Sequence, residues 1–145
     1  MRSEPLCAWC QNWYLVRETG ITMFGPSPHI TVPEVSWGEF LSATADYGAE
    51  IAGRDLSAAD PGALSYAVLT MCRGLRTLRL NVLGSKQEAA AWAMERMPDW
   101  AWLIEAALRC RLSRGRSGFR DDETRRAAGR FVGLLGRELA TIGRE

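Results

Sequence analysis

Three cationic residues in the middle of the chain have types and a spacing suited to binding an anion: Arg73, Arg76 and Lys86. Ser85 and Glu88 form the pattern of a capping box, so a helix is predicted to begin at Lys86. A lysine there is unfavourable beside the positive end of the helix dipole, but the free backbone N–H groups at the same place favour an anion. These groups together predict an anion site, with phosphate as the favoured ligand. The alternative is that Lys86 is a solvated surface charge.

The residues of this site need helices to position them, and the apolar spacing predicts an all-α fold. We expect a compact bundle of about five or six helices with short loops. The clearest helix is 64–78, where apolar residues recur at steps of three and four. The loop 81–84 is short enough to fold the next helix, 86–97, back as a hairpin, which would bring Arg73 near Lys86.

The remaining segments are assigned from periodicity and from turn residues. Further helices are predicted over 5–18, 37–51, 99–112 and about 121–142. Asp99 is the expected cap of the helix 99–112. Residues 21–24 form a short apolar alternation, which predicts a strand or an extended piece, and the proline-rich segment 25–33 is predicted to be a connector.

Composition limits the classes of function that remain. The 145 residues include 18 Lys+Arg and 17 Asp+Glu, a net charge of +1, which argues against a nucleic-acid binder. No apolar run approaches the roughly 20 residues of a membrane span, and residues 1–5 do not resemble a signal peptide, so we expect a cytoplasmic protein without a membrane partner. The cysteines and the single histidine show no metal-ligand or nucleophile pattern, so neither site is predicted. Lys86 is the only lysine.

Two stretches around the cations resemble a known family. Residues 66–73 (YAVLTMCR) and 84–98 (GSKQEAAAWAMERMP) are similar to the C-terminal helical domain of aminoglycoside adenylyltransferases, the spectinomycin and streptomycin resistance enzymes. The separation of Arg73 from Lys86 fits the family pattern without a gap. Residues 16–20 (VRETG) and 24–26 (FGP) resemble the junction between the two domains of that family. The resemblance thus describes 1–145 as a single helical domain, with 1–33 similar to the junction and 34–145 to the C-terminal domain.

The resemblance implies an activity in which ATP and Mg²⁺ bind between a nucleotidyltransferase domain and this helical domain, and AMP passes to a hydroxyl of the antibiotic. Arg73 and Lys86 match the family residues that clasp the ATP phosphates. In the family, a Gly-Ser dipeptide is followed by an Asp-x-Asp pair that holds magnesium. This sequence has no Asp-x-Asp pair, and no such aspartates follow Gly84-Ser85. No catalytic residue or metal ligand is therefore predicted, and a nucleotidyltransferase domain supplied in trans is expected for activity.

Recognition of the drug is a further departure. The family has acidic residues just before the helix 64–78, which contact the amines of the aminoglycoside, but the matching position here is Ala63. Asp60 is the nearest acid and becomes the candidate substrate contact, followed by Asp55. Two other interpretations stay open: a free-standing helical interaction module without transferase activity, and a non-functional remnant.

Overall fold

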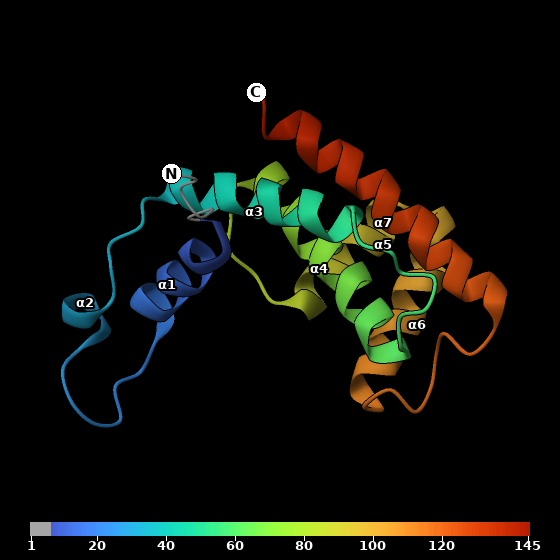
Figure 1. Cartoon of the computed structure of the whole chain (residues 1–145), viewed down its shortest axis with the longest axis horizontal. Coiled ribbons are helices and arrows are strands. Elements are labelled where there is room, and N and C mark those ends of the chain that lie inside the picture. The colour runs from blue at the N-terminus through green and yellow to red at the C-terminus, as the bar shows by residue number, and fades with distance from the viewer. Residues whose placement is uncertain (1–6) are drawn as a thin grey trace.

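The computed structural model describes residues 7–145, and this part of the chain forms seven α-helices and one 3₁₀ helix, without a strand (Figure 1). The all-α prediction is confirmed. The α-helices are α1 (Cys7–Thr19), α2 (Pro28–Thr31), α3 (Trp37–Ala52), α4 (Pro61–Leu80), α5 (Lys86–Arg96), α6 (Ala101–Leu112) and α7 (Asp122–Ile142), and the 3₁₀ helix η1 is Pro98–Trp100.

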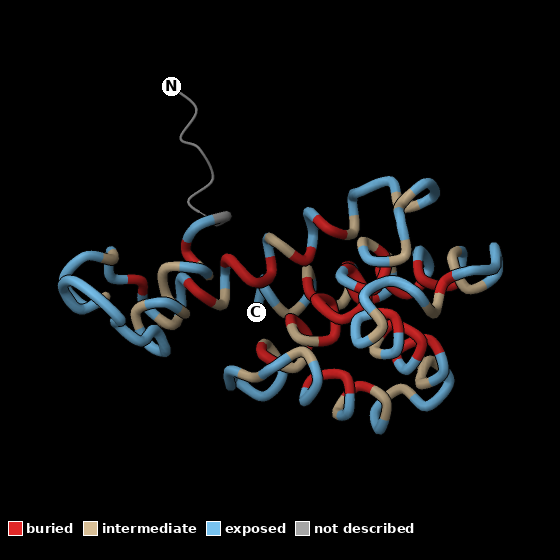
Figure 2. The backbone as a smooth tube through the Cα atoms, turned by 90° about the horizontal axis from the view of Figure 1, so that it is seen from below, coloured by how far each residue is buried: buried red, intermediate tan, exposed pale blue. Residues whose placement is uncertain are grey.

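Helix α4 lies at the centre of the bundle, because it packs against α3, α5, α6 and α7. Its predicted apolar stripe is confirmed: Leu64, Val68, Met71 and Leu75 are all buried. Figure 2 shows the buried positions gathered in this bundle, whereas the segment of α1 and α2 extends from one end and is largely exposed. Helix α1 reaches the bundle through α3.

Local capping signals set the helix boundaries that position the cations. Ser36 with Glu39 and Ser85 with Glu88 both form the predicted capping boxes, in which each serine hydroxyl accepts from the glutamate N–H and each carboxylate accepts from the serine N–H. Asn81 ends α4 in the left-handed conformation with φ of 57°. That conformation is tolerated by asparagine and turns the chain back towards α5.

Several sequence expectations need correction. The connector 25–33 contains α2, because Ser27 caps it and Pro28 supplies a fixed φ at its first position. Residues 21–24 form no strand, because the backbone there is irregular and bends at residues 23 and 24, and Phe24 is fully exposed. Asp99 does not cap α6, since it lies within η1, and the residue before α6, Trp100, makes no side-chain cap. The predicted start of the first helix, residues 5–6, lies outside the described residues.

The thiols of Cys10, Cys72 and Cys110 are free and buried, and burial raises the pKa of the Cys72 thiol to about 12. Between residues 7 and 145, no helix is both long and apolar enough to cross a membrane.

Candidate anion-binding site

The turn between α4 and α5 brings Arg73 and Lys86 into one region, as the hairpin prediction required. Tyr66 and Arg73 are seven residues apart on α4, which is two turns, so they share one face of the helix. The Lys86 Nζ lies 3.7 Å from the centroid of the Tyr66 ring, in a cation–π contact. The first residue of α5 therefore lies directly against the face of α4 that carries Arg73.

Lys86 has an unusual electrostatic environment. Burial, and then the positive charges of Arg73 and Arg111, lower the pKa of the Lys86 amine to about 8. Arg111 comes from the last turn of α6, so three helices contribute one cation each. Within residues 9–145 none of these three side chains forms an ion pair or a hydrogen bond. We call Arg73, Lys86 and Arg111 the cation cluster, and its uncompensated charge suits an anion.

The start of α5 adds backbone donors to the cation cluster. The capping box uses the N–H groups of Ser85 and Glu88, and the N–H groups of Lys86 and Gln87 at the first two helical positions have no helical partner. Hydrogen bonds from Ser85 lower the pKa of the Glu88 carboxyl, which stays ionised at the helix start. Arg76, which the sequence grouped with the other two cations, instead donates to the Leu83 carbonyl at 3.4 Å and belongs to the connecting loop.

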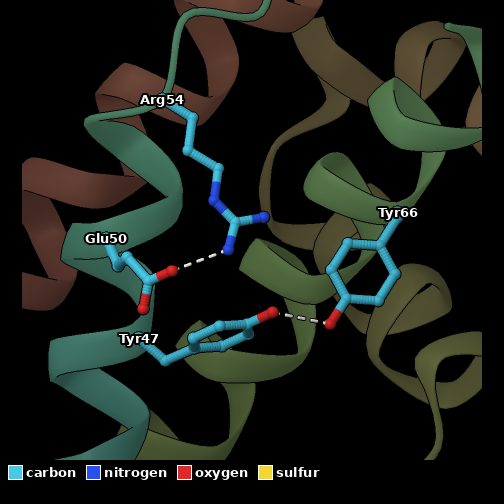
Figure 3. A network of polar contacts seen from close by, with 4 residues as sticks. All are labelled: Tyr47, Glu50, Arg54 and Tyr66. Atoms are coloured by element: carbon cyan, nitrogen blue, oxygen red, sulfur yellow. Dashed lines mark hydrogen bonds and ion pairs between the residues drawn. The ribbon is translucent and has the colours of Figure 1, made fainter. Parts of the chain in front are cut away.

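A cavity of about 240 Å³ opens beside Arg73, between α1, α3 and α4. Its lining includes Thr70, whose buried hydroxyl has no hydrogen-bond partner in the described part of the chain. Two further lining residues, Tyr47 of α3 and Tyr66 of α4, join their hydroxyl groups at 2.8 Å (Figure 3). Burial and the hydrogen bond to Tyr66 raise the pKa of Tyr47. The cavity thus combines polar groups with an adjacent positive charge, and no local sequence pattern predicted it.

The same view shows an ion pair near the cavity. Arg54 donates to Glu50 at 2.7 Å, and its guanidinium carbon lies 5.8 Å from the centroid of the Tyr47 ring (Figure 3). Glu50 is the acid that lines the cavity, and it is paired with this arginine. Arg73 is therefore the charged lining residue that has no ion-pair partner among the described residues.

Asp60, the candidate substrate contact, lies at the start of α4, away from Arg73 but close enough to α6 for its charge to act on Cys110, the neighbour of Arg111. The Asp60 carboxylate caps α4 by accepting from the Ala63 N–H at 2.9 Å. Arg73 is 13 residues further along the chain, which corresponds to about 20 Å along the helix axis. Asp55 likewise has a local partner, the Ser57 N–H at 3.0 Å.

The side chains present do not fit a magnesium ion. The described residues hold no group of three or more His, Cys, Asp or Glu side chains that could bind a metal. A hard divalent cation such as Mg²⁺ needs carboxylate or phosphate oxygens, whereas the cation cluster repels it.

Fold and site together define a helical domain in which the lysine at the start of one helix is subject to the positive charge of arginines from two others. The profile of a family described as aminoglycoside adenylyltransferase, C-terminal domain, matches residues 47–135, more than half of the chain. The chain belongs to this family. The matched segment contains the whole cation cluster and both cavity tyrosines. Searches of curated proteins and of solved structures gave no match.

Proposed function

We propose that this chain binds the phosphates of ATP through the cation cluster, as the helical domain of an enzyme that transfers AMP to a hydroxyl of an aminoglycoside. The observation that carries the proposal is that Arg73 of α4 and Arg111 of α6 act electrostatically on Lys86 at the start of α5, while none of the three has an acidic partner among the described residues. Membership of the adenylyltransferase family makes ATP the phosphate compound of choice.

The three cations have complementary parts in such binding. Arginine offers a planar fork of N–H donors that matches phosphate oxygens, and lysine offers a compact point charge. The free N–H groups at the start of α5 add uncharged donors to the same anion. Phosphoryl transfer depends mainly on positioning and on neutralising charge, which are the contributions this domain can make.

Magnesium ligands and a general base would come from a nucleotidyltransferase domain, in the same polypeptide or in another one. Support for such a partner is the exposed apolar character of α1 and the segment after it, where side chains lack cover from the described chain. These exposed residues are Trp9, Val16, Ile21, Met23, Phe24 and Ile30. In this proposal residues 1–33 serve as the junction and residues 34–145 as the helical domain.

The acceptor in this proposal is an aminoglycoside, as family membership implies. Amines of such a drug need carboxylates, and Asp60 remains the candidate contact on the α4 side. Because its carboxylate also caps α4, substrate contact and helix capping have to be separated experimentally.

Titration calorimetry with ATP tests the nucleotide site. We expect weak binding that decreases with added salt, because screening weakens exposed charge contacts. Loss of a charge-assisted contact in Lys86→Ala should cost about 1.5–3 kcal/mol, or roughly tenfold or more in affinity. Arg130→Gln is the matched control, since Arg130 is an exposed cation on α7 and does not act on Lys86. Equal affinities for wild type and Lys86→Ala, or no wild-type binding at millimolar ATP, would contradict the proposal.

A second assay tests the division of labour between domains. Protein with the printed sequence alone, incubated with ATP, Mg²⁺ and streptomycin or spectinomycin, should yield no AMP–antibiotic product by mass spectrometry. The physical reason is that the described side chains provide no magnesium site. Detection of that product from the pure chain would contradict it.

A further inference from the structure

The Lys86 amine lies against an aromatic ring and forms no ion pair or hydrogen bond within the described residues. Its Nζ atom is 3.7 Å from the centroid of the Tyr66 ring, a close cation–π contact. The face of an aromatic ring carries negative charge density, so it attracts the protonated amine. The ring covers one side of the ammonium group, which has three N–H donors and can still offer them to an anion.

We propose that Tyr66 is a positioning residue whose ring holds the protonated Lys86 amine in place for an anion, and that the hydroxyl of Tyr47 in turn holds the Tyr66 ring. The inference rests on the proposed phosphate site and deepens it. It gives a part in binding to two side chains that need not touch the phosphate themselves.

Lys86 has physical reasons to leave the site when nothing holds it. A lysine side chain is long and flexible, and it loses much of its rotamer freedom when an anion fixes it. As the first residue of α5 it is also repelled by the positive end of the helix dipole. A contact that favours the charged amine at this position therefore orders the side chain before the ligand arrives, which reduces the cost of binding.

The Tyr66 ring needs support of its own, because 42% of this residue is exposed and packing holds it only in part. The support comes from α3, where the Tyr47 hydroxyl lies 2.8 Å from the Tyr66 hydroxyl (Figure 3). On the Tyr47 ring lies the Arg54 guanidinium, 5.8 Å from the centroid, and Arg54 is paired with Glu50 at 2.7 Å. A row of polar and cation–π contacts thus runs from α3 through α4 to the amine at the start of α5.

This row lies beside the cavity between α1, α3 and α4. Tyr47, Tyr66 and Arg73 all line that cavity. Holding the amine against Tyr66 keeps it on the face of α4 that also carries Arg73. An anion that binds at this face would meet an amine that is already in place.

Nuclear magnetic resonance tests the positioning without any nucleotide. Lys86 is the only lysine, so protein labelled with ¹³C-lysine gives one set of lysine side-chain signals. Protons above an aromatic ring are shifted upfield. We expect shifted Lys86 Hε signals in the wild type and in Tyr66→Phe, which keeps the ring, but signals at the free-lysine position in Tyr66→Leu.

Trp102→Leu is the matched control for this measurement. Trp102 is an aromatic residue of α6 with a similar exposure, 46% against 42% for Tyr66, and it should leave the Lys86 signals unchanged. Lys86 signals at the free-lysine position in the wild type would overturn the proposal. So would shifted signals that persist in Tyr66→Leu.

Titration calorimetry with ATP and with inorganic pyrophosphate tests the effect on binding. Tyr66→Leu should weaken binding about two- to tenfold, because the anion then has to order the amine itself, whereas Trp102→Leu should have no effect. In a chain that already carries Lys86→Gln, Tyr66→Leu should cause no further loss, since the ring acts through the amine. An equal loss with and without Lys86 would show that Tyr66 acts directly on the ligand or on the fold, and would overturn the positioning role.

The hydroxyl pair has its own test. Tyr47→Phe and Tyr66→Phe remove the same hydrogen bond, so each should cause the same small loss of affinity, and the double variant should lose no more than either. Wild-type affinity in Tyr47→Phe would overturn the part assigned to Tyr47.

The two probes keep this inference distinguishable from the nucleotide function. ATP binding that is unchanged in Tyr66→Leu defeats only the positioning role. Pyrophosphate binding that depends on Tyr66 and Lys86, without binding of ATP, supports the positioning role and defeats the nucleotide function. Absence of binding for both probes defeats both.

Discussion

Raising the pH should weaken ATP binding by about tenfold between pH 7 and pH 9, because Lys86 loses its charge in this range. Burial and the neighbouring arginines lower the pKa of Lys86 to about 8 in the free protein. The charged fraction therefore falls from roughly nine-tenths at pH 7 to one-tenth at pH 9. Phosphate groups, with a second pKa of about 6, are already ionised throughout, and arginines do not titrate here. The sign follows: an anion binds the protonated amine, so affinity is highest below pH 8 and is lost above it.

Calorimetric titrations at pH 7, 8 and 9 and constant ionic strength measure this dependence. Lys86→Arg should keep high affinity with little change across the range, because the guanidinium stays charged. Lys86→Gln should bind weakly at every pH. A wild-type affinity that does not change, or one that changes equally in Lys86→Gln, would refute the assignment of the pH effect to Lys86.

Three further outcomes concern stability and capping. Lys86→Gln should raise the free energy of unfolding at pH 7 by about 0.3–1 kcal/mol in chemical denaturation, because it removes a cation from a helix N-terminus; a loss of stability would show that the amine is favourably placed. Gly48→Ala should cost about 1–3 kcal/mol, since an added Cβ would lie 2.5 Å from the Leu139 Cδ1. The matched control is Gly129→Ala, because Gly129 lies on the exposed face of α7 with open space around it. This variant should stabilise the protein by about 0.5–1 kcal/mol. Thermal unfolding that ranks the two variants the other way would contradict the prediction. Asp60→Asn should keep the α4 cap and the melting temperature, whereas Asp60→Ala should lower the free energy of unfolding by about 0.5–2 kcal/mol. A drug-binding defect in the folded Asp60→Asn variant would mark a substrate contact.

Features that depend on a few neighbouring residues were predictable from the sequence. The capping boxes at Ser36 and Ser85 bring together groups three residues apart, so the pattern itself contains both partners. The apolar stripe from Leu64 to Leu75 was equally local, and the short loop after Asn81 limited how α5 could lie against α4. These signals were enough to indicate helices, their order and the approach of Lys86 to Arg73. They failed where competing local signals were close in strength, as at α2, where three prolines favoured a connector but Ser27 and Pro28 start a helical turn.

Other properties depended on how distant segments pack. Arg111 is one of five arginines in the segment 109–120, and nothing local in that segment links it to Lys86. The packing of α6 beside α5 and α4 lets its charge act on Lys86. The cavity between α1, α3 and α4, and the Tyr47–Tyr66 hydroxyl pair beside it, likewise join residues from separate helices. Sequence alone therefore determined the helical class and a cationic helix start. Tertiary structure decided that the start is partly buried among other cations, because burial and charge repulsion arise only when separate helices come together.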